Sequence, residues 1–304
     1  MKNESQVVIL LATYNGEKFI REQLDSILNQ TYTNFKLRIR DDGSKDKTVS
    51  ILQEYAEKDS RISYYTGENL RAAGCFYDLI CNSADADYYA FCDQDDVWEE
   101  NKLEVAITQL EKGNKEVPTL YLSNLKVVDE KLNFLKNRHE KPIKTDSKYY
   151  PLVEFLAVGC TQVFNKKALE LVRNHLPGNK ILHDAWMFLS CSFFGKIIYD
   201  FEPHILYRQH SNNVVGHKTK KIDRLKEKFK RLFDRSIQPR KEQAKIFLEA
   251  YNDLLGDEAH YVKKIVDYKR GLIKRLSLLF NRKIKASSFG RDFKYRLLIL
   301  WGAI

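Results

Sequence analysis

Three carboxylates within four positions, Asp93, Asp95 and Asp96, follow directly after the apolar run Tyr88-Tyr89-Ala90-Phe91-Cys92. Such a run is typical of a strand that is buried on both faces. Crowded negative charge costs free energy unless a cation or hydrogen-bond donors neutralise it, and hard divalent cations that carry phosphates take carboxylate oxygens as ligands. The cluster therefore indicates a metal–diphosphate site. The alternative is an acidic turn in which Asp95 or Asp96 caps a helix that begins at Trp98.

The elements before this cluster alternate between strand and helix. Apolar runs predict strands, and residues with helical spacing, such as Ile20, Leu24 and Ile27, predict helices between them. This βαβαβαβ order predicts an α/β fold with a doubly wound, mostly parallel sheet. Ligands bind such sheets at the carboxyl ends of the strands. The four predicted strands are Val7 to Ala12, Phe35 to Ile39, Ile62 to Tyr65 and Tyr88 to Cys92.

The order loosens after residue 100. We expect a helix that carries Leu103 and Leu110, a polar surface loop over 129–150, and a helix near 184–193. Further strands are expected at 119–122, 160–164, 196–200 and His204 to Arg208. Residues 217–304 form a basic C-terminal region with a helical pattern and no strand signal.

Charge is distributed unevenly along the 304 residues. Residues 1–216 carry 27 Lys and Arg against 31 Asp and Glu, whereas residues 217–304 carry 24 against 10. The asymmetry indicates that the tail meets an anionic surface. The five cysteines form no CxxC pair. Four of them sit within apolar runs, so they are interpreted as reduced, buried thiols, which argues against a zinc site. With no signal peptide and no apolar run of spanning length, we expect a cytoplasmic protein.

Three more polar loops follow predicted strands or open a predicted helix: Thr13-Tyr14-Asn15-Gly16, Asp41-Asp42-Gly43-Ser44 and His183-Asp184. Their order and spacing over about residues 6–216 resemble the inverting glycosyltransferases of family 2, which have the GT-A fold. The segments Asp93 to Trp98, His183 to Trp186 and Tyr207 to His210 look most like the bacterial rhamnosyltransferase-like branch. The resemblance implies a nucleotide-sugar-binding subdomain at 1–100, an acceptor-binding subdomain of the same domain at 101–216, and the basic helical region at 217–304.

The resemblance also implies roles in donor binding. Thr13, Tyr14 and Asn15 would line the pyrimidine pocket, and Asp42 would accept a hydrogen bond from N3–H of the base; the alternative is that these residues only form turns and helix caps. Where relatives often have Asn-Leu-Gly, this chain has Asn69-Leu70-Arg71. Arg71 would either reach the donor phosphate or point to solvent.

For the metal, Asp95 would be the stronger ligand, and Asp93 would bind ribose or the metal through water. Mg²⁺ or Mn²⁺ suits carboxylate and phosphate oxygens. Asp96 would cap the next helix or approach the donor sugar. By resemblance Arg208 and His210 would face the diphosphate or the metal, although a lone histidine is usually structural.

Asp184 is the predicted general base, which would deprotonate an acceptor hydroxyl as it attacks the anomeric carbon. A single displacement gives inversion. The alternative is that Asp184 caps the helix that it opens. His183 is left as a partner of Asp184 or a turn residue.

The expected function is metal-dependent, inverting transfer of L-rhamnose from dTDP-L-rhamnose to a lipid-linked or growing polysaccharide. The alternative donors are a UDP-hexose and a UDP-N-acetylhexosamine, because thymine and uracil present the same edge. A nucleotidyltransferase is disfavoured because the loop Thr13 to Gly16 has one glycine, and a nonenzymatic membrane-docking module remains a third alternative.

The basic region has two interpretations. Its helices either pack on the catalytic domain with Lys and Arg in water, or they attach the protein to the inner face of the cell membrane. Lipid-linked acceptors in this branch favour a peripheral membrane contact. The region shows no nucleic-acid recognition motif, so no nucleic-acid partner is expected.

Overall fold

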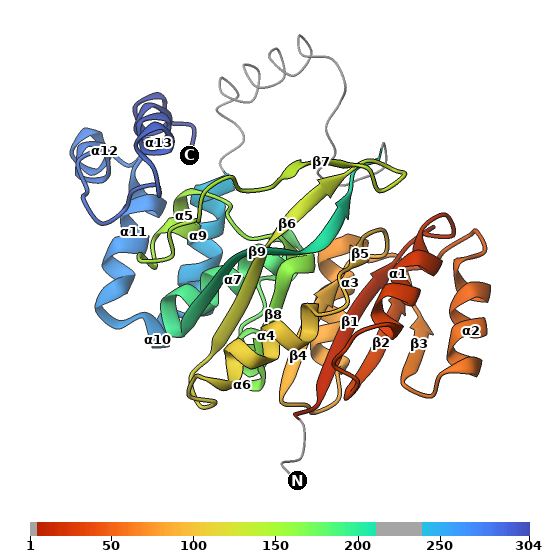
Figure 1. Cartoon of the computed structure of the whole chain (residues 1–304). Helices are drawn as coiled ribbons and strands as arrows, with labels where there is room; N and C mark the ends of the chain where they lie inside the picture. Colours follow the sequence, from red (N-terminus) through yellow and green to blue (C-terminus); the bar gives the residue numbers. More distant parts are fainter. Residues whose placement is uncertain (1–4, 211–238) are drawn as a thin grey trace. The chain divides into compact units, whose positions relative to one another are not determined.

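The computed structural model describes residues 5–210 and 239–304. The described residues form two compact units, one made of residues 5–143 and 157–210 and the other of residues 144–156 and 239–304. The first unit is built on a nine-stranded sheet covered by helices, and the second unit is helical (Figure 1).

The first four strands are parallel, as the sequence predicts. They lie in the order β3-β2-β1-β4, so β1 pairs with both β2 and β4. Thr13 lies beside Asp41, and Leu11 lies beside Cys92. The loops that follow β1, β2 and β4 therefore leave the sheet at the same edge. These strands are β1 (Val7–Thr13), β2 (Phe35–Asp41), β3 (Ile62–Thr66) and β4 (Tyr88–Cys92).

The second half of the sheet is mixed. Beyond β4 the order continues β8-β6-β9-β5, with β7 paired to β6. Only the β6–β9 pair is parallel in this half; the other pairs are antiparallel. The strands are β5 (Val97–Trp98), β6 (Thr119–Val128), β7 (Phe134–Asn137), β8 (Gln162–Asn165) and β9 (Lys196–Arg208).

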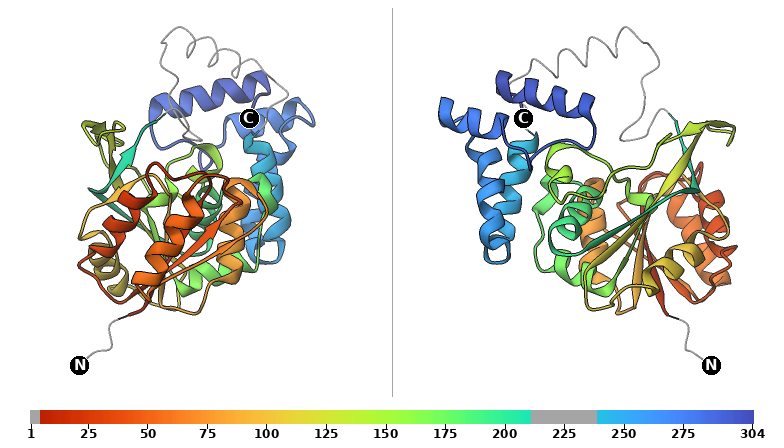
Figure 2. Two further views of the ribbon diagram at one scale, coloured as in Figure 1. Left: turned by 90° about the vertical axis from the view of Figure 1, so that its right-hand side faces the viewer. Right: turned by 60° about the vertical axis from the view of Figure 1, so that its left-hand side comes forward.

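Helices cover both faces of the sheet (Figure 1, Figure 2). Val7, Ile9 and Leu11 of β1 belong to one core cluster with helices α1 (Ile20–Leu28), α2 (Thr48–Lys58) and α4 (Lys102–Glu111). Successive residues of a strand point to opposite faces, so Val8 and Leu10, which are also buried, face the other layer. That layer contains α3 (Arg71–Asn82), α6 (Lys166–Arg173) and α7 (His183–Phe194), with two 3-10 turns, η1 (Gly159–Thr161) and η2 (Gly178–Lys180).

Three local expectations are corrected. The helix expected from Trp98 begins at Lys102, because Val97 and Trp98 pair with β9 as a short strand. The segment 129–150 is not only a loop, since it contains β7, whose adjacent apolar residues Phe134 and Leu135 are both exposed. The strands expected at 196–200 and 204–208 are one continuous strand, β9.

In the second unit, the part of the expected helical region that the structure describes contains no strand. Residues 217–238 of that prediction lie outside the described residues. Across the described residues no helix is both long and apolar enough to cross a bilayer. The helices are α5 (Tyr150–Val153), α9 (Pro239–Ala250), α10 (Asn252–Leu255), α11 (Ala259–Asp267), α12 (Leu272–Leu279) and α13 (Phe289–Trp301), with the 3-10 turn η3 (Gly256–Glu258).

Candidate active site

Gln94 connects the loops after β1 and β4. Its side-chain oxygen accepts a hydrogen bond from N–H of Tyr14 at 2.8 Å, and its side-chain nitrogen donates to the carbonyl of Tyr14 at 3.1 Å. A Cβ atom at Gly16 would lie 2.3 Å from Oε1 of Gln94. A side chain at position 16 would therefore displace Gln94 from its hydrogen bonds with Tyr14.

The loop after β2 is organised by the fully buried carboxylate of Asp41. This carboxylate accepts hydrogen bonds from Oγ1 of Thr13 at 2.8 Å and from N–H of Gly43 and Ser44 at 3.1 and 2.9 Å. Asn15 joins the same network, because its N–H donates to Oγ of Ser44 at 2.8 Å. The predicted pyrimidine-pocket residues Thr13 and Asn15 thus fix the loop. The neighbouring ring of Tyr14 is 46% exposed and is accessible to a ligand.

Asp42 is buried beside Arg40, a residue that the sequence interpretation missed. The guanidinium of Arg40 donates to Oδ1 of Asp42 and also to Asp78 at 2.9 Å, and N–H of Leu70 donates to the same Oδ1 at 2.9 Å. Burial alone would lower the pKa of Arg40, but the hydrogen bond to Asp42 helps to raise it above its usual value. Arg40 therefore fixes the position of the Asp42 side chain. The signal in the sequence was an arginine two positions before it, at the end of a buried strand.

Arg71 is the first residue of α3 and has a backbone φ of 60°. This left-handed region favours glycine, the residue that the family resemblance leads us to expect here. The side chain of Arg71 is exposed, and its N–H donates to Oδ1 of Asn69 at 3.2 Å.

The acidic loop after β4 brings Asp95 together with His210. Nε2 of His210 lies 2.7 Å from Oδ2 of Asp95, and the ring of Phe19 packs on the imidazole at 4.9 Å between centroids. Burial, followed by the negative charges of Asp95 and Asp184, raises the pKa of Asp93. The predicted metal ligands and the predicted base are thus electrostatically coupled.

Asp96 has a different environment from the expected helix cap. Its Oδ1 accepts a hydrogen bond from N–H of Arg208 at 3.1 Å, and its Oδ2 has no hydrogen-bond partner among the described residues. Helix α4 begins six residues later, with Asn101 at its N-cap and no side-chain capping bond. Burial and the charges of Asp95 and Asp93 raise the pKa of Asp96 well above its usual value.

The carboxylates fit a hard divalent cation. Ligand atoms of Asp93, Asp96 and Cys160 lie within 4.8 Å of one another. The predicted set was Asp93, Asp95 and His210; the structure pairs Asp95 with His210 and groups Asp93 with Asp96 and Cys160. A cation would relieve the repulsion that raises these pKa values and would satisfy Oδ2 of Asp96. Carboxylates suit Mg²⁺ or Mn²⁺, whereas a thiol suits softer metals.

Asp184 lies in the first turn of α7 and is buried. Its carboxylate accepts hydrogen bonds from N–H of Ala185 at 2.7 Å and from N–H of Gly159 at 3.1 Å. Burial raises the pKa of Asp184 to about 6, although these hydrogen bonds oppose the shift. The N-cap of α7 is Leu182 and no side chain caps it, so Asp184 does not have the alternative capping role.

His183 lies in the core next to this site. Its ring stacks on Phe76 with centroids 3.7 Å apart and meets Phe91 edge-on at 4.6 Å. Burial lowers the pKa of His183 to about 3, so the imidazole is neutral at pH 7. Neither ring nitrogen has a hydrogen-bond partner among the described residues. His183 is therefore neither a turn residue nor a hydrogen-bonded partner of Asp184.

Arg208 binds the acidic loop through its guanidinium group. Its guanidinium donates to the carbonyl of Asp95 at 3.0 Å, to the carbonyl of Glu130 at 2.6 Å and to the carboxylate of Glu22 at 2.6 Å. The side chain is 1% exposed and packs over Phe19. In this arrangement Arg208 positions Asp95. Its contact with the diphosphate stays a prediction.

Comparison with known proteins identifies the class. The Staphylococcus aureus TarS 1-349 structure in complex with UDP-GlcNAc matches with a TM-score of 0.55, covering 97% of this chain and 90% of that chain at 14% identity. At this identity the likeness shows the fold alone. The mixed sheet with carboxylates at its strand ends thus has the GT-A fold.

The family follows from the sequence comparisons. The model of glycosyl transferase family 2 matches residues 8–173, so the chain belongs to this family. It is 33% identical to the dTDP-rhamnosyl transferase RfbG of Shigella flexneri, over 78% of this chain and 83% of that protein. It is also 31% identical to an Escherichia coli UDP-Glc:alpha-D-GlcNAc-diphosphoundecaprenol beta-1,3-glucosyltransferase, WfgD, over 54% of this chain and 61% of that protein.

Proposed function

We propose that this chain is a metal-dependent, inverting rhamnosyltransferase that uses dTDP-L-rhamnose and an acceptor hydroxyl of a lipid-linked or growing polysaccharide. The observation that carries the proposal is geometric: the N–H of Gly159 binds the carboxylate of Asp184, and the next residue, Cys160, lies with Asp93 and Asp96. A general base acts on the acceptor hydroxyl, and a metal-binding carboxylate acts on the leaving diphosphate. Both are needed in one site because the two groups react at the same carbon.

The donor's base is assigned to the loops after β1 and β2. Asp42 accepts the N3–H of a pyrimidine, and Arg40 holds the Asp42 side chain in place through their ion pair. The exposed ring of Tyr14 packs on the base. Gln94 holds this pocket against the acidic loop through both of its hydrogen bonds to Tyr14.

The diphosphate is assigned to the acidic loop. Asp93 and Asp95 hold the divalent ion, and His210 orients Asp95 from 2.7 Å. A bound Mg²⁺ or Mn²⁺ would supply positive charge near the diphosphate oxygens, which would stabilise the leaving nucleotide. Oδ2 of Asp96 offers one further acceptor beside Asp93.

Asp184 acts as the general base. Two backbone N–H groups fix its orientation, and a pKa of about 6 leaves it ionised at pH 7 yet more basic than an exposed aspartate. It takes the acceptor proton while the hydroxyl oxygen attacks the anomeric carbon and the nucleotide diphosphate leaves. One displacement inverts the anomeric configuration.

Donor and acceptor assignments are supported by relatives. The relative named as a dTDP-rhamnosyl transferase matches most of this chain. A UDP-sugar is the second candidate, because WfgD is named for UDP-Glc and TarS is solved with UDP-GlcNAc. The acceptor in the name of WfgD is a diphosphoundecaprenol, which supports a lipid-linked acceptor and a peripheral position on the cytoplasmic face of the membrane.

The test is a donor panel with purified protein. dTDP-L-rhamnose, UDP-Glc, UDP-GlcNAc and a GDP-sugar are each incubated with a polyprenyl-diphosphate saccharide, with Mn²⁺ or with EDTA, and the product's anomeric configuration is read by NMR. We expect Mn²⁺-dependent transfer of rhamnose with inversion. Transfer only from a UDP-sugar replaces the donor assignment, and unchanged turnover by Asp184→Asn contradicts the base.

A further inference from the structure

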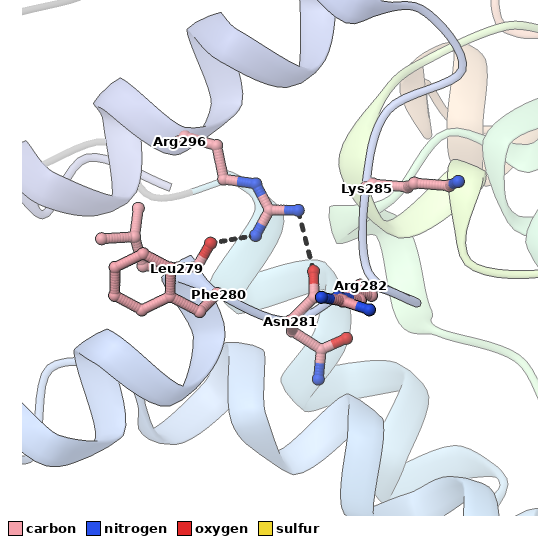
Figure 3. A pocket seen from close by; sticks show the side chains of 6 residues that line it. All are labelled: Leu279, Phe280, Asn281, Arg282, Lys285 and Arg296. Carbon is pink, nitrogen blue, oxygen red and sulfur yellow. Dashed lines mark hydrogen bonds between the residues drawn. The ribbon is translucent and has the colours of Figure 1, made fainter.

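Helices α12 and α13 form an antiparallel pair that is fixed by two arginines. Arg296 of α13 reaches the end of α12, where it donates to the carbonyls of Leu279 and, at 2.8 Å, of Asn281 (Figure 3). Arg275 of α12 donates in return to the carbonyl of Leu300 at 3.5 Å. These hydrogen bonds therefore hold the two helices together.

Each helix of the pair leaves an apolar stripe in solvent. On α12 and the residue after it the stripe has the spacing i, i+4, i+8, and on α13 the spacing is the same. Two of these side chains, Phe280 and Phe289, are 74% and 89% exposed. Such spacing keeps side chains on one side of a helix. We call the six residues the α12–α13 face: Leu272, Leu276, Phe280, Phe289, Phe293 and Leu297.

The surroundings of this face are strongly basic. Residues 268–304 contain ten Lys and Arg and one acidic residue, Asp292, which gives this segment a net charge of +9. The carboxylate of Asp292 is engaged within the second unit, because it accepts hydrogen bonds from N–H of Ala286 at 3.0 Å and from Arg296 at 3.3 Å. Few acidic side chains therefore oppose the approach of an anionic surface.

A hollow of about 400 Å³ lies at the end of α12 and offers cations beside the apolar stripe (Figure 3). Its lining includes Phe280, Arg282, Lys285 and Arg296. Arg296 is occupied by main-chain carbonyls. Arg282 and Lys285 are exposed and form no ion pair with a described residue. Their chemistry suits a phosphodiester, which is negatively charged and accepts hydrogen bonds.

We infer that the α12–α13 face docks on a bilayer that contains anionic lipids. Its apolar side chains enter the boundary between headgroups and acyl chains, and Arg282 and Lys285 bind lipid phosphates. The proposed function includes a membrane contact, and this inference names the residues that make it. It relies on the proposed function only for the cellular setting. A second copy of the chain is disfavoured as occupant, because two surfaces of like charge repel each other.

The experiment is sedimentation of the full chain with vesicles, without donor, metal or acceptor, so that its failure is distinguishable from failure of the catalytic proposal. We expect binding to phosphatidylglycerol–phosphatidylcholine vesicles at low salt, little binding to pure phosphatidylcholine, and weakening with added salt. The double variant Phe289→Ser/Phe293→Ser should bind at least about tenfold more weakly. The variant Arg282→Gln/Lys285→Gln should lose roughly tenfold on anionic vesicles only.

The matched control variants remove the same numbers of exposed apolar and basic side chains from the first unit. Phe134→Ser/Leu135→Ser changes two apolar residues that are 60% and 53% exposed on β7, and Lys36→Gln/Lys112→Gln removes two exposed charges; both should bind as wild type does. The inference is overturned if the wild type does not sediment at low salt, or if the Phe289/Phe293 variant binds like its control. A wild-type dimer in light scattering that becomes monomeric in that variant would assign the face to self-association instead.

Discussion

The ammonium group of Lys102 lies 3.7 Å from the centre of the Trp98 ring in the core of the first unit. The residue is 1% exposed, and Nζ has no hydrogen-bond partner among the described residues. Burial lowers the pKa of Lys102 to about 8, opposed by the nearby groups of Cys92, Cys160 and Asp96. A buried cation without a hydrogen bond costs stability, and the nearby carboxylate of Asp96 opposes only part of the fall in its pKa.

We expect Lys102→Met to stabilise the fold and to lower the turnover of the enzyme. Loss of the buried charge should raise the free energy of unfolding by roughly 1–3 kcal/mol at pH 7. The gain should shrink above pH 8, because the wild-type lysine then loses its proton in the fold. Turnover should fall, since the acidic loop loses a nearby positive charge. Denaturant unfolding and kcat are measured on the same preparation; a less stable variant contradicts the expectation.

Asp184→Asn should abolish turnover without abolishing donor binding. Loss of a general base costs roughly 10²–10⁴-fold in rate. In the wild type kcat/KM should rise with pH up to about 6, the pKa of the buried carboxyl, and then level off. The variant should retain its thermal shift with dTDP and Mn²⁺. An equally steep acid limb in the residual activity of Asp184→Asn would assign that limb to another group.

The same carboxyl should affect stability with a defined sign. Because the folded pKa of Asp184 lies above its unfolded value, the folded state binds more protons between about pH 4 and 6. Without metal, wild-type stability relative to Asp184→Asn should therefore fall by about 2 kcal/mol from pH 4 to pH 7. Urea titrations at both pH values measure this difference. A difference that is independent of pH would mean an ordinary pKa for Asp184.

Gly16→Ala should disturb the donor pocket through Gln94. The new Cβ would meet Oε1 of Gln94 at 2.3 Å and displace the side chain that holds Tyr14. We expect the KM for the donor to rise roughly tenfold, with the same effect in Gln94→Ala and no further loss in the double variant, because the two changes act on one contact. Additive losses in donor titrations would show independent roles.

Arg71→Gly separates backbone strain from ligand binding. Glycine relieves the cost of a φ of 60°, worth roughly 1 kcal/mol, although part of this gain is lost through the more flexible unfolded chain. If the side chain reaches the donor phosphate, donor affinity falls while stability holds or rises. Calorimetry with the nucleotide sugar reads the first effect and thermal unfolding the second. Unchanged affinity would leave Arg71 as a solvent-facing residue.

The sequence predicted the first half of the sheet well, because each strand from β1 to β4 is a short apolar run followed by a turn. It predicted the second half less well. The two-residue strand β5 exists only through its pairing with Leu206 and Ile205 of β9, and the exposed side chains of β7 carry no alternation. Both β5 and β7 form through pairing with strands that are distant in the sequence, and the local sequence pattern carries no information on such pairing.

The candidate site shows the same division. Motifs identified the acidic loop, Asp42 and Asp184, since those carboxylates follow or open regular elements. They did not identify the residues that hold them. Arg40 also bonds to Asp78 of α3, Gln94 bonds to Tyr14 in another loop, and Lys102 lies against the buried ring of Trp98. His183 was equally hidden, because its stacking on Phe76 depends on the packing of α7 against α3.

Residues 144–156 have a consequence for any attempt to shorten this chain. They come from the middle of the sequence but pack with the C-terminal helices: Tyr149 bonds to Glu258, and Glu154 accepts from Ser287 and Arg291. A fragment that stops at residue 216 would strip these side chains of their partners. The second unit therefore draws on two separate stretches of the chain, so that exchanging it between family members would require replacing both stretches at once.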